Sequence, residues 1–357
     1  MPGRRTSDNI IIVQKVIRTL ISRRGRTGYI ALKLDLEKAY DHLEWSFIRE
    51  TLEYFQVPPS LITLIMNMIS STRFHILWNG SPLPEVVPSQ GIRQGDPLSP
   101  YLFILCLERL SIKLNEAVRD KHIHPINFRT GVRLSHLFFT DDIFLFTKAT
   151  ARDCQNHSRI LLDFCAMSGQ LMSTTKSKTW FSPRTPRRIK DQVAGILGLP
   201  TTDRIGTYLG TPIFTTRRTA SSCQYLVDNI RKRIEGWQAR YLSMAGRATL
   251  IKASITSVPL YAMQIMLLPK KVCHRIDQMC CHFFWGDTEQ HKRCHTVNWE
   301  TVTLPKEAGG LGMSSTRHRN KAILMNQAWR LHSNTTALWA RVLKAKYFPH
   351  ATMFTSP

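Results

Sequence analysis

Apolar positions along the first half of the chain follow two different spacings, and the change of spacing predicts its elements. Residues 9–20 repeat with helical spacing, whereas residues 29–35 form a continuous apolar run that predicts a buried strand ending in the carboxylate of Asp35. Helical spacing then returns in four further segments, which occupy residues 45–55, 61–68, 98–118 and 153–166. The pattern predicts helices that alternate with a few short strands.

A pair of acids interrupts a second apolar stretch. Residues 136–146 predict two short strands with Asp141 and Asp142 at their junction. Asn79-Gly80 predicts a hairpin turn, because this pair tolerates the positive φ angles that a tight turn requires. Beyond about residue 215 the chain changes to helices separated by turns.

Charge points to a polyanionic partner. The 357 residues include 49 Lys and Arg against 25 Asp and Glu, which gives a formal net charge of +24. The basic residues fall in many short groups, as expected for a groove lined by several elements, although any single group is also explained as a solvated surface.

Cysteine usage and hydropathy limit the location of the protein. The eight Cys include no Cys-x-x-Cys pair, and no apolar leader follows Met1. We therefore expect an intracellular protein, nuclear or cytoplasmic and not secreted. Every apolar run is shorter than the roughly 20 residues of a membrane-spanning helix, so no membrane partner is expected.

The acids suggest metal chemistry. Asp35 and the Asp141-Asp142 pair end separate apolar strands, and unpaired carboxylates that meet in apolar surroundings repel one another. Mg²⁺ prefers such oxygen ligands, and two ions about 4 Å apart can activate a 3′-hydroxyl and stabilise leaving pyrophosphate. An Asp-Asp pair alone is more often a solvated turn.

Two other segments of the sequence favour a metal site over a solvated turn. Residues 36–41 read LEKAYD directly after Asp35, and residues 89–103 read SQGIRQGDPLSPYLF. With the Asp141-Asp142 hairpin, in this order, they closely resemble the palm motifs of reverse transcriptases of the non-LTR (LINE-type) retrotransposon and group II intron type. The resemblance implies an α+β right-hand polymerase fold, with an antiparallel palm sheet packed on helices, partial fingers and a helical thumb.

The resemblance also implies an RNA-directed DNA polymerase that extends a DNA primer on an RNA template with deoxynucleoside triphosphates. The implied metal ligands, for two Mg²⁺ ions or Mn²⁺ in their place, are Asp35, Asp141, Asp142 and the backbone carbonyl of Leu36. The implied nucleotide-binding residues are Tyr40 as a gate against the ribose 2′-hydroxyl, Gln90 and Gly91 at the nascent base pair, and Arg93 at a phosphate. Lys176, in a stretch that resembles the next palm motif, matches a general acid for pyrophosphate.

Later segments resemble the parts that hold the primer and template. Residues 236–252 resemble the helical thumb of plant LINE-type elements. Expected primer or template contacts, some of which are equally explained as turn or surface residues, are Tyr208, Leu209, Gly210, Arg240, Arg247 and Lys252. The expected domains are 1–214 (fingers remnant and palm), 215–285 (helical thumb) and 286–357 (a helical region resembling the zinc-binding-like region associated with reverse transcriptases). The Cys and His spacing between 273 and 295 nevertheless disfavours zinc, and helical periodicity explains Cys280 as a core residue.

Some positions depart from the family pattern. Thr140 replaces the usual Ala before the paired acids, and Leu171 and Ser173 replace a common Lys and Asn. Residues 2–9 match a segment inside the fingers, which suggests an N-terminally truncated fragment with impaired catalysis. The alternatives are a catalytically inactive nucleic-acid-binding remnant and an RNA-dependent RNA polymerase, although Tyr40 disfavours ribonucleotides. No hydrolase motif is present.

Overall fold

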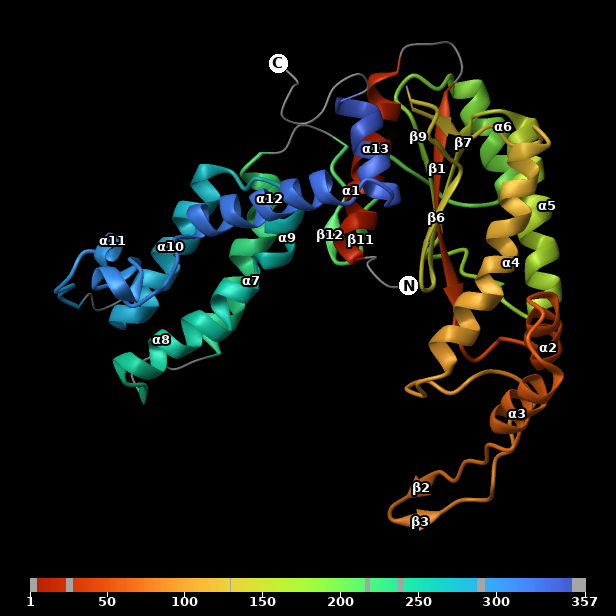
Figure 1. Ribbon diagram of the computed structural model, residues 1–357, viewed down its shortest axis with the longest axis horizontal. Coiled ribbons are helices and arrows are strands. Elements are labelled where there is room, and N and C mark those ends of the chain that lie inside the picture. Colours follow the sequence, from red (N-terminus) through yellow and green to blue (C-terminus); the bar gives the residue numbers. More distant parts are fainter. Residues whose placement is uncertain are drawn as a thin grey trace. The chain divides into compact units, whose positions relative to one another are not determined.

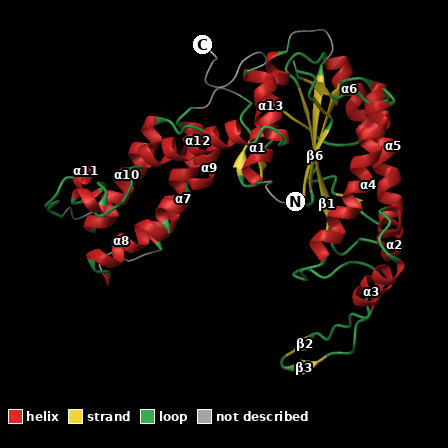
Figure 2. Ribbon diagram, viewed as in Figure 1, coloured by secondary structure: helices red, strands yellow, loops and turns green. Residues whose placement is uncertain are grey.

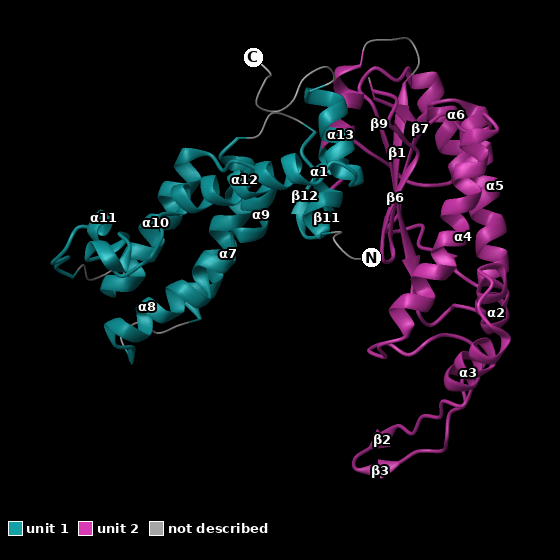
Figure 3. Ribbon diagram, in the orientation of Figure 1, with its two compact units in different colours: residues 1–14, 207–357 teal, residues 15–206 magenta. Residues whose placement is uncertain are grey.

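The chain forms two compact units. The computed structural model describes residues 5–23, 28–128, 130–215, 219–236, 241–287 and 293–348. Residues 15–206 make up one unit, the sheet unit, and residues 1–14 with 207–357 make up the other, the helical unit (Figure 3). The boundary between the units follows Gly206, whereas the expected domain boundary was after residue 214. The difference arises because the hairpin of β11 (Thr207–Tyr208) and β12 (Thr211–Pro212) belongs to the helical unit. Within that unit, Gln14 Nε2 donates to the Pro212 carbonyl at 2.9 Å.

A six-stranded sheet is the centre of the sheet unit (Figure 2). Its strands run in the order β10-β9-β1-β7-β6, with β8 also paired to β1. Every pair is antiparallel except β9 with β10. The strands are β1 (Tyr29–Glu37), β6 (His136–Phe139), β7 (Asp142–Lys148), β8 (Leu171–Met172), β9 (Lys178–Phe181) and β10 (Thr201–Thr202). The apolar run of β1 follows from its central position, where Ile30, Leu32 and Leu34 are fully buried.

Helices cover one face of this sheet. The segments α4 (Ser99–Arg119), α5 (Ala151–Ser168) and α6 (Arg187–Leu197) lie along it, with α2 (Trp45–Tyr54) and α3 (Pro59–Ser70) beyond one end (Figure 1). One core joins strand residues such as Leu145 to helix residues such as Phe103 and Phe164. The expected α+β class and antiparallel sheet packed on helices are confirmed.

Two small hairpins extend this unit. The strands β2 (Leu77–Trp78) and β3 (Ser81–Pro82) are joined by Asn79 and Gly80, which both have positive φ angles, as the sequence predicted. The other hairpin pairs β4 (Ile126–Asn127) with β5 (Arg133–Leu134). The hairpin of β2 and β3 projects beyond α3, away from the sheet (Figure 1).

The helical unit contains α7 (Gln224–Glu235), α8 (Met244–Ala253), α9 (Leu260–Ile265), α10 (Lys270–Trp285), α11 (Trp299–Val302), α12 (Thr316–Ser333) and α13 (Leu338–Tyr347). The first residues of α1 (Thr6–Ser22) belong to it as well. Cys280 is buried in its core, as the helical periodicity predicted. Within the described ranges, no helix is long and apolar enough to cross a membrane.

One buried amide joins two parts of the helical unit. Asn320 on α12 is fully buried, and its Oδ1 accepts from the Leu268 backbone NH at 2.8 Å. Its Nδ2 donates to the carbonyls of Met263 and Met266 at 3.1 and 3.0 Å. The side chain therefore satisfies three backbone groups where α9 ends and the connection to α10 begins.

We predict that Asn320→Ala lowers the free energy of unfolding by about 2–4 kcal/mol, because it leaves three buried backbone groups without partners. Urea unfolding followed by circular dichroism measures the change. Asn326→Ala, at an exposed position of the same helix, is the matched control and should change stability by less than about 0.5 kcal/mol. Equal effects of the two substitutions would contradict the assignment.

Candidate active site

The pairing of β1 with β7 brings the predicted acids together. In the antiparallel register Asp35 lies directly opposite Asp142, and Asp141 occupies the turn between β6 and β7. Residues directly opposite in such a ladder have Cα atoms about 4.5–5.5 Å apart. Carboxylates from two segments separated by more than a hundred residues thus meet at one end of the sheet.

Two lysines offset part of the negative charge of these carboxylates. Lys33 Nζ lies 3.8 Å from Asp142 Oδ1, and Lys176 Nζ lies 3.5 Å from Asp35 Oδ2. The Lys176 side chain is 72% exposed, whereas the two aspartates are each only about a fifth exposed. Asp35 and Lys176, but not Lys33 or Asp142, border a pocket of about 410 Å³ whose lining is Asp35, Leu36, Lys38, Ala39, Tyr40, Gln94, Gly95, Pro100, Asp141 and Lys176.

Burial and crowding disfavour the charged form of Asp142. Partial burial raises the pKa of its carboxyl group most, and the negative charges of Asp141 and Asp35 raise that pKa further. Lys33 acts in the opposite direction, but the net pKa is still raised. The pKa of Tyr40 is raised as well, first by burial and then by the charge of Asp141. The end of the sheet is therefore a place where added positive charge would be favourable.

Two serines hold the backbone of Asp35, a role that the sequence analysis did not predict, although it named Ser173 as a departure from the family pattern. Ser177 Oγ accepts from the Asp35 backbone NH at 3.1 Å, and the Ser173 backbone NH donates to the Asp35 carbonyl at 2.9 Å. Both serines are buried. They follow β8, which pairs with the end of β1. Only their nearness to Lys176 in the sequence could have indicated them.

Thr140 contacts the acid beside it. Its hydroxyl lies 2.9 Å from Asp141 Oδ1 and 2.7 Å from the Phe139 carbonyl. Its φ angle is +50°, an unfavourable conformation for a β-branched residue. The family's usual Ala would lack both the hydroxyl and the β-branch. The departure noted in the sequence therefore has a direct structural effect on a candidate ligand.

Tyr40 lies in a loop of residues 38–44, the gate loop, that packs against the segment carrying Gly91. The Ile92 backbone NH donates to the Tyr40 carbonyl at 2.8 Å, and the Gly91 backbone NH donates to the Leu43 carbonyl at 2.8 Å. Gly91 has a φ angle of +87°, and a Cβ there would lie 2.7 Å from the Asp41 carbonyl oxygen. Glycine is thus required both for the backbone conformation and for the close approach.

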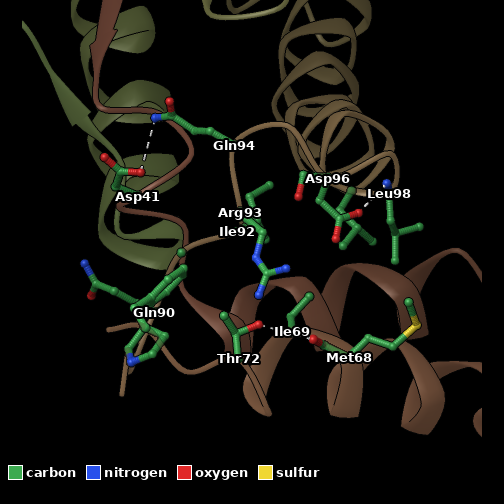
Figure 4. Close-up of a pocket in the computed structure, with 15 residues that line it drawn as sticks. Asp41, Met68, Ile69, Thr72, Gln90, Ile92, Arg93, Gln94, Asp96 and Leu98 are labelled. Atoms are coloured by element: carbon green, nitrogen blue, oxygen red, sulfur yellow. Dashed lines mark hydrogen bonds between the residues drawn. The ribbon is translucent and has the colours of Figure 1, made fainter. Parts of the chain in front are cut away.

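A second pocket, of about 480 Å³, adjoins this segment (Figure 4). Gln90, Gly91 and Arg93 line it, and the Arg93 side chain reaches toward the end of α3, where Ile69 on the helix and Thr72 just after it form the opposite wall (Figure 4). The Arg93 guanidinium also lies 5.7 Å from the centre of the Phe74 ring. The pocket therefore combines a cation, amide groups and the carboxylates of Asp41 and Asp96 with apolar walls.

Among the described residues, the expected primer and template contacts have different surroundings. Tyr208 is fully buried, and Leu209 and Gly210 have the positive φ angles of a tight turn in the β11–β12 hairpin. Lys252 Nζ donates to the Leu311 carbonyl on the surface of the helical unit. Arg240 lies outside the described residues.

Arg247 requires a correction. Its side chain is buried, and its guanidinium donates to the carbonyls of Phe284 at 2.7 Å and Leu242 at 3.2 Å. The guanidinium satisfies the hydrogen-bonding capacity of a backbone carbonyl at the end of α10, so it is not available for a phosphate contact. The sequence interpretation failed because a basic residue in a helix gives no sign of which way it points.

A metal site is not preformed in the described part of the chain. No group of three or more His, Cys, Asp or Glu side chains among the described residues is arranged to hold an ion as they stand. In the helical unit, His282 Nδ1 and His295 Nε2 both contact Asp287 Oδ2, at 2.7 and 3.0 Å. His291 lies outside the described residues.

Comparison with known proteins identifies the family. The family model described as "Reverse transcriptase (RNA-dependent DNA polymerase)" matches residues 1–226, which is more than half of the chain. The chain belongs to the reverse transcriptase family. The membership expected from the strand-ending acids and the segment around Gly91 is confirmed.

Relatives agree with the LINE-type resemblance. The chain is 24% identical to the Xenopus laevis transposon TX1 149 kDa protein, over 97% of this chain and 26% of that protein. It is 31% identical to the Pol polyprotein of the Drosophila melanogaster type-2 retrotransposable element R2DM, over 50% of this chain and 16% of that protein. A putative ribonuclease H protein of Arabidopsis thaliana is 36% identical, over 38% of this chain and 22% of its own length. The matches to these three proteins thus cover about a quarter or less of the length of each.

We predict that Asp142→Asn stabilises the metal-free protein at pH 7, by at most about 1 kcal/mol since the carboxylate is partly exposed and screened. A carboxyl group with a raised folded-state pKa stabilises the fold when protonated, and that contribution is lost as pH rises through the folded pKa. The uncharged amide of Asn does not lose this contribution at pH 7. The stability advantage of Asp142→Asn over the wild type should therefore disappear near pH 3, below the unfolded pKa of about 3.9. Thermal unfolding at both pH values, with the exposed Asp163→Asn as control, tests this; a loss of stability at pH 7 would show that the Lys33 contact dominates.

Proposed function

We propose that the chain is the polymerase core of a LINE-type reverse transcriptase, which extends a DNA primer on an RNA template by two-metal nucleotidyl transfer. One observation carries this proposal: Asp35 and Asp142 are paired across β1 and β7 in a chain that belongs to the reverse transcriptase family. In this proposal the sheet unit acts as palm with partial fingers, and the helical unit supplies the thumb.

The proposed metal ligands are the carboxylates of Asp35, Asp141 and Asp142, with the backbone carbonyl of Leu36. When bound, two Mg²⁺ ions would activate the primer 3′-hydroxyl and stabilise the charge on the leaving pyrophosphate. The donor set suits this ion, because all its atoms are hard oxygens and because burial, followed by repulsion from Asp141 and Asp35, already raises the pKa of Asp142. Lys33 and Lys176 supply part of the positive charge that the carboxylates need.

Lys176 is proposed as the general acid for pyrophosphate. Its ammonium group borders the pocket with Asp35 and Asp141, and its side chain is mostly exposed and able to swing from Asp35 toward a triphosphate. An ammonium group can both neutralise a phosphate oxygen and give it a proton. The buried neighbours Ser173 and Ser177 fix the backbone on either side of it.

Tyr40 is proposed as the sugar gate. Its ring borders the same pocket and stacks on Phe103, with ring centres 5.1 Å apart and planes 19° from parallel. Because that packing restricts the ring, a ribose 2′-hydroxyl would meet a fixed obstacle, and deoxynucleotides are preferred. The raised pKa of Tyr40 keeps its hydroxyl neutral beside the acids.

The remaining roles concern the nucleic acid. We assign the nascent base pair to Gln90 and Gly91, since the glycine allows a close approach and the amide offers both a donor and an acceptor. Arg93 would bind a phosphate in the pocket of Figure 4. The net charge of +24 would hold the template and primer through their backbones. Lys252 and the turn of Leu209 and Gly210 are proposed contacts of the primer strand, whereas the fully buried Tyr208 side chain is not available for one.

An inactive nucleic-acid-binding remnant is the second candidate. It is favoured by the ion pairs of Lys33 and Lys176 with the aspartates, and by the Thr140 hydroxyl on Asp141, because these contacts use oxygens that the ions would need. Such a protein would bind template and primer with the same dependence on salt and show no divalent-ion-dependent synthesis.

We predict Mg²⁺-dependent extension of a DNA primer on an RNA template, abolished by chelation. Asp35→Asn and Asp141→Ala should each lower the rate by about 10³-fold, because each removes a charge that would hold the ions. Asp163→Asn, at an exposed position on α5, should leave the rate unchanged. Synthesis by the Asp141→Ala variant at the wild-type rate would exclude the proposed site, and binding without synthesis by the wild type would favour the remnant.

We predict that Tyr40→Ala lowers discrimination against ribonucleotides by roughly 10–100-fold, since the space freed beside the sugar admits the 2′-hydroxyl. Single-nucleotide incorporation with dNTP and rNTP gives the ratio of kcat/KM values. Tyr54→Ala, a half-exposed tyrosine on α2, is the control for loss of an aromatic ring. An unchanged ratio in Tyr40→Ala would remove Tyr40 from the site.

A further inference from the structure

A buried glutamine outside the pocket lining contacts the gate loop. Gln170 is 1% exposed, and its Nε2 donates to the Ala39 carbonyl at 2.8 Å across 131 positions of sequence. The partner is a carbonyl oxygen, which only accepts, so the amide nitrogen must face it. Its Oε1 has no hydrogen-bond partner among the described residues. A buried amide with a single bond packs less favourably than Leu or Met, so packing alone does not account for it.

The bond acts on the peptide group that enters Tyr40. The Ala39 carbonyl and the Tyr40 NH belong to one planar unit, so fixing the carbonyl fixes the whole plane. The peptide that leaves Tyr40 is fixed as well, because its carbonyl accepts from the Ile92 backbone NH at 2.8 Å. With both planes held, the φ and ψ angles of Tyr40 are set, and with them the direction of its Cα–Cβ bond.

Gln170 is itself held rigidly. It follows the end of α5, where Gly169 adopts a left-handed conformation with φ +75°, and its NH donates to Ser168 Oγ at 3.3 Å. The Glu44 NH donates to the Ser168 carbonyl at 3.0 Å. A Cβ on Gly169 would lie 2.5 Å from the His42 carbonyl oxygen, so this corner packs tightly against the gate loop. The next residues enter β8, which pairs with the end of β1.

We infer that Gln170 is a positioning residue for Tyr40, and that its hydrogen bond to Ala39 sets how strongly the polymerase rejects ribonucleotides. The inference rests on the proposed function, and specifically on Tyr40 as the sugar gate. Gln170 does not touch the nucleotide; it acts by holding the ring where the 2′-hydroxyl would clash. Without the bond the Ala39–Tyr40 peptide can rotate, and the ring yields to the ribose.

The test compares Gln170→Met, which keeps the length of the side chain and removes the donor, with the wild-type chain. Discrimination, the ratio of kcat/KM for dNTP to that for rNTP, should fall roughly 3–10-fold, the size expected for one hydrogen bond. Incorporation of dNTP should change less than incorporation of rNTP. A merely structural role would slow both sugars equally and leave the ratio unchanged, and that result would overturn the inference.

A matched control is available in the same chain. Gln14 is also buried and donates through Nε2 to a backbone carbonyl, that of Pro212 at 2.9 Å, so Gln14→Met removes a similar bond without touching the gate loop. Its discrimination should equal that of the wild type. If Gln170→Met does not fold, Gln170→Asn and Gln14→Asn replace the pair, since they keep the amide and shorten its reach. The Asn variant at position 170 must then lower the ratio, and a wild-type ratio would refute the inference.

A double substitution separates this inference from the proposed function. If Gln170 acts through Tyr40, then Gln170→Met added to Tyr40→Ala should leave the ratio of the single Tyr40→Ala variant unchanged. A further fall in the double variant would show that Gln170 acts by another route. Should Tyr40→Ala itself leave the ratio unchanged, the sugar gate fails, and the inference fails with it. A ratio that falls in Tyr40→Ala but not in Gln170→Met refutes the inference alone.

Discussion

The antiparallel register of β1 against β7 is the constraint on which the site depends. It places Asp35 opposite Asp142 with no intervening residue, and a slip of one position would turn Asp142 to the other face of the sheet. The buried side chains further along both strands, such as Ile30, Leu32 and Leu145, hold the register. Exposing them would cost more free energy than separating the carboxylates would gain. The free energy of apolar packing thus offsets the repulsion between the carboxylates, which would not come together on their own.

Much of this arrangement was readable from the sequence. The continuous apolar run before Asp35 and the paired acids between two apolar stretches gave the strands, and a carboxylate that ends a buried strand is hard to explain unless it is used. The turn at Asn79-Gly80 also follows from local backbone preference. What these features share is that each depends on neighbours in the chain.

The features that could not be read depend on distant partners. Gln170 resembles any polar residue after a helix until the Ala39 carbonyl is known to face it. Arg247 has the composition of a phosphate-binding residue, and only its burial against Phe284 assigns it to the end of a helix. The boundary after Gly206 likewise follows from a contact between Gln14 and Pro212 that no local pattern encodes. Propensity and spacing are local quantities, whereas these contacts are properties of the packed chain.

The site combines a rigid backbone with side chains that are electrostatically unsatisfied. Hydrogen bonds with Ser173 and Ser177 hold the backbone of Asp35, and one with Ile92 holds that of Tyr40, so the acids cannot relieve their repulsion by moving their backbones apart. Added positive charge relieves this repulsion, and Lys33 and the exposed Lys176 supply part of that charge. A cation that replaces Lys176 at Asp35 would release that lysine toward a triphosphate. Binding of the ion and freeing of the proposed general acid would then be the same event, so neither the affinity for metal nor the position of Lys176 can be tuned without changing the other.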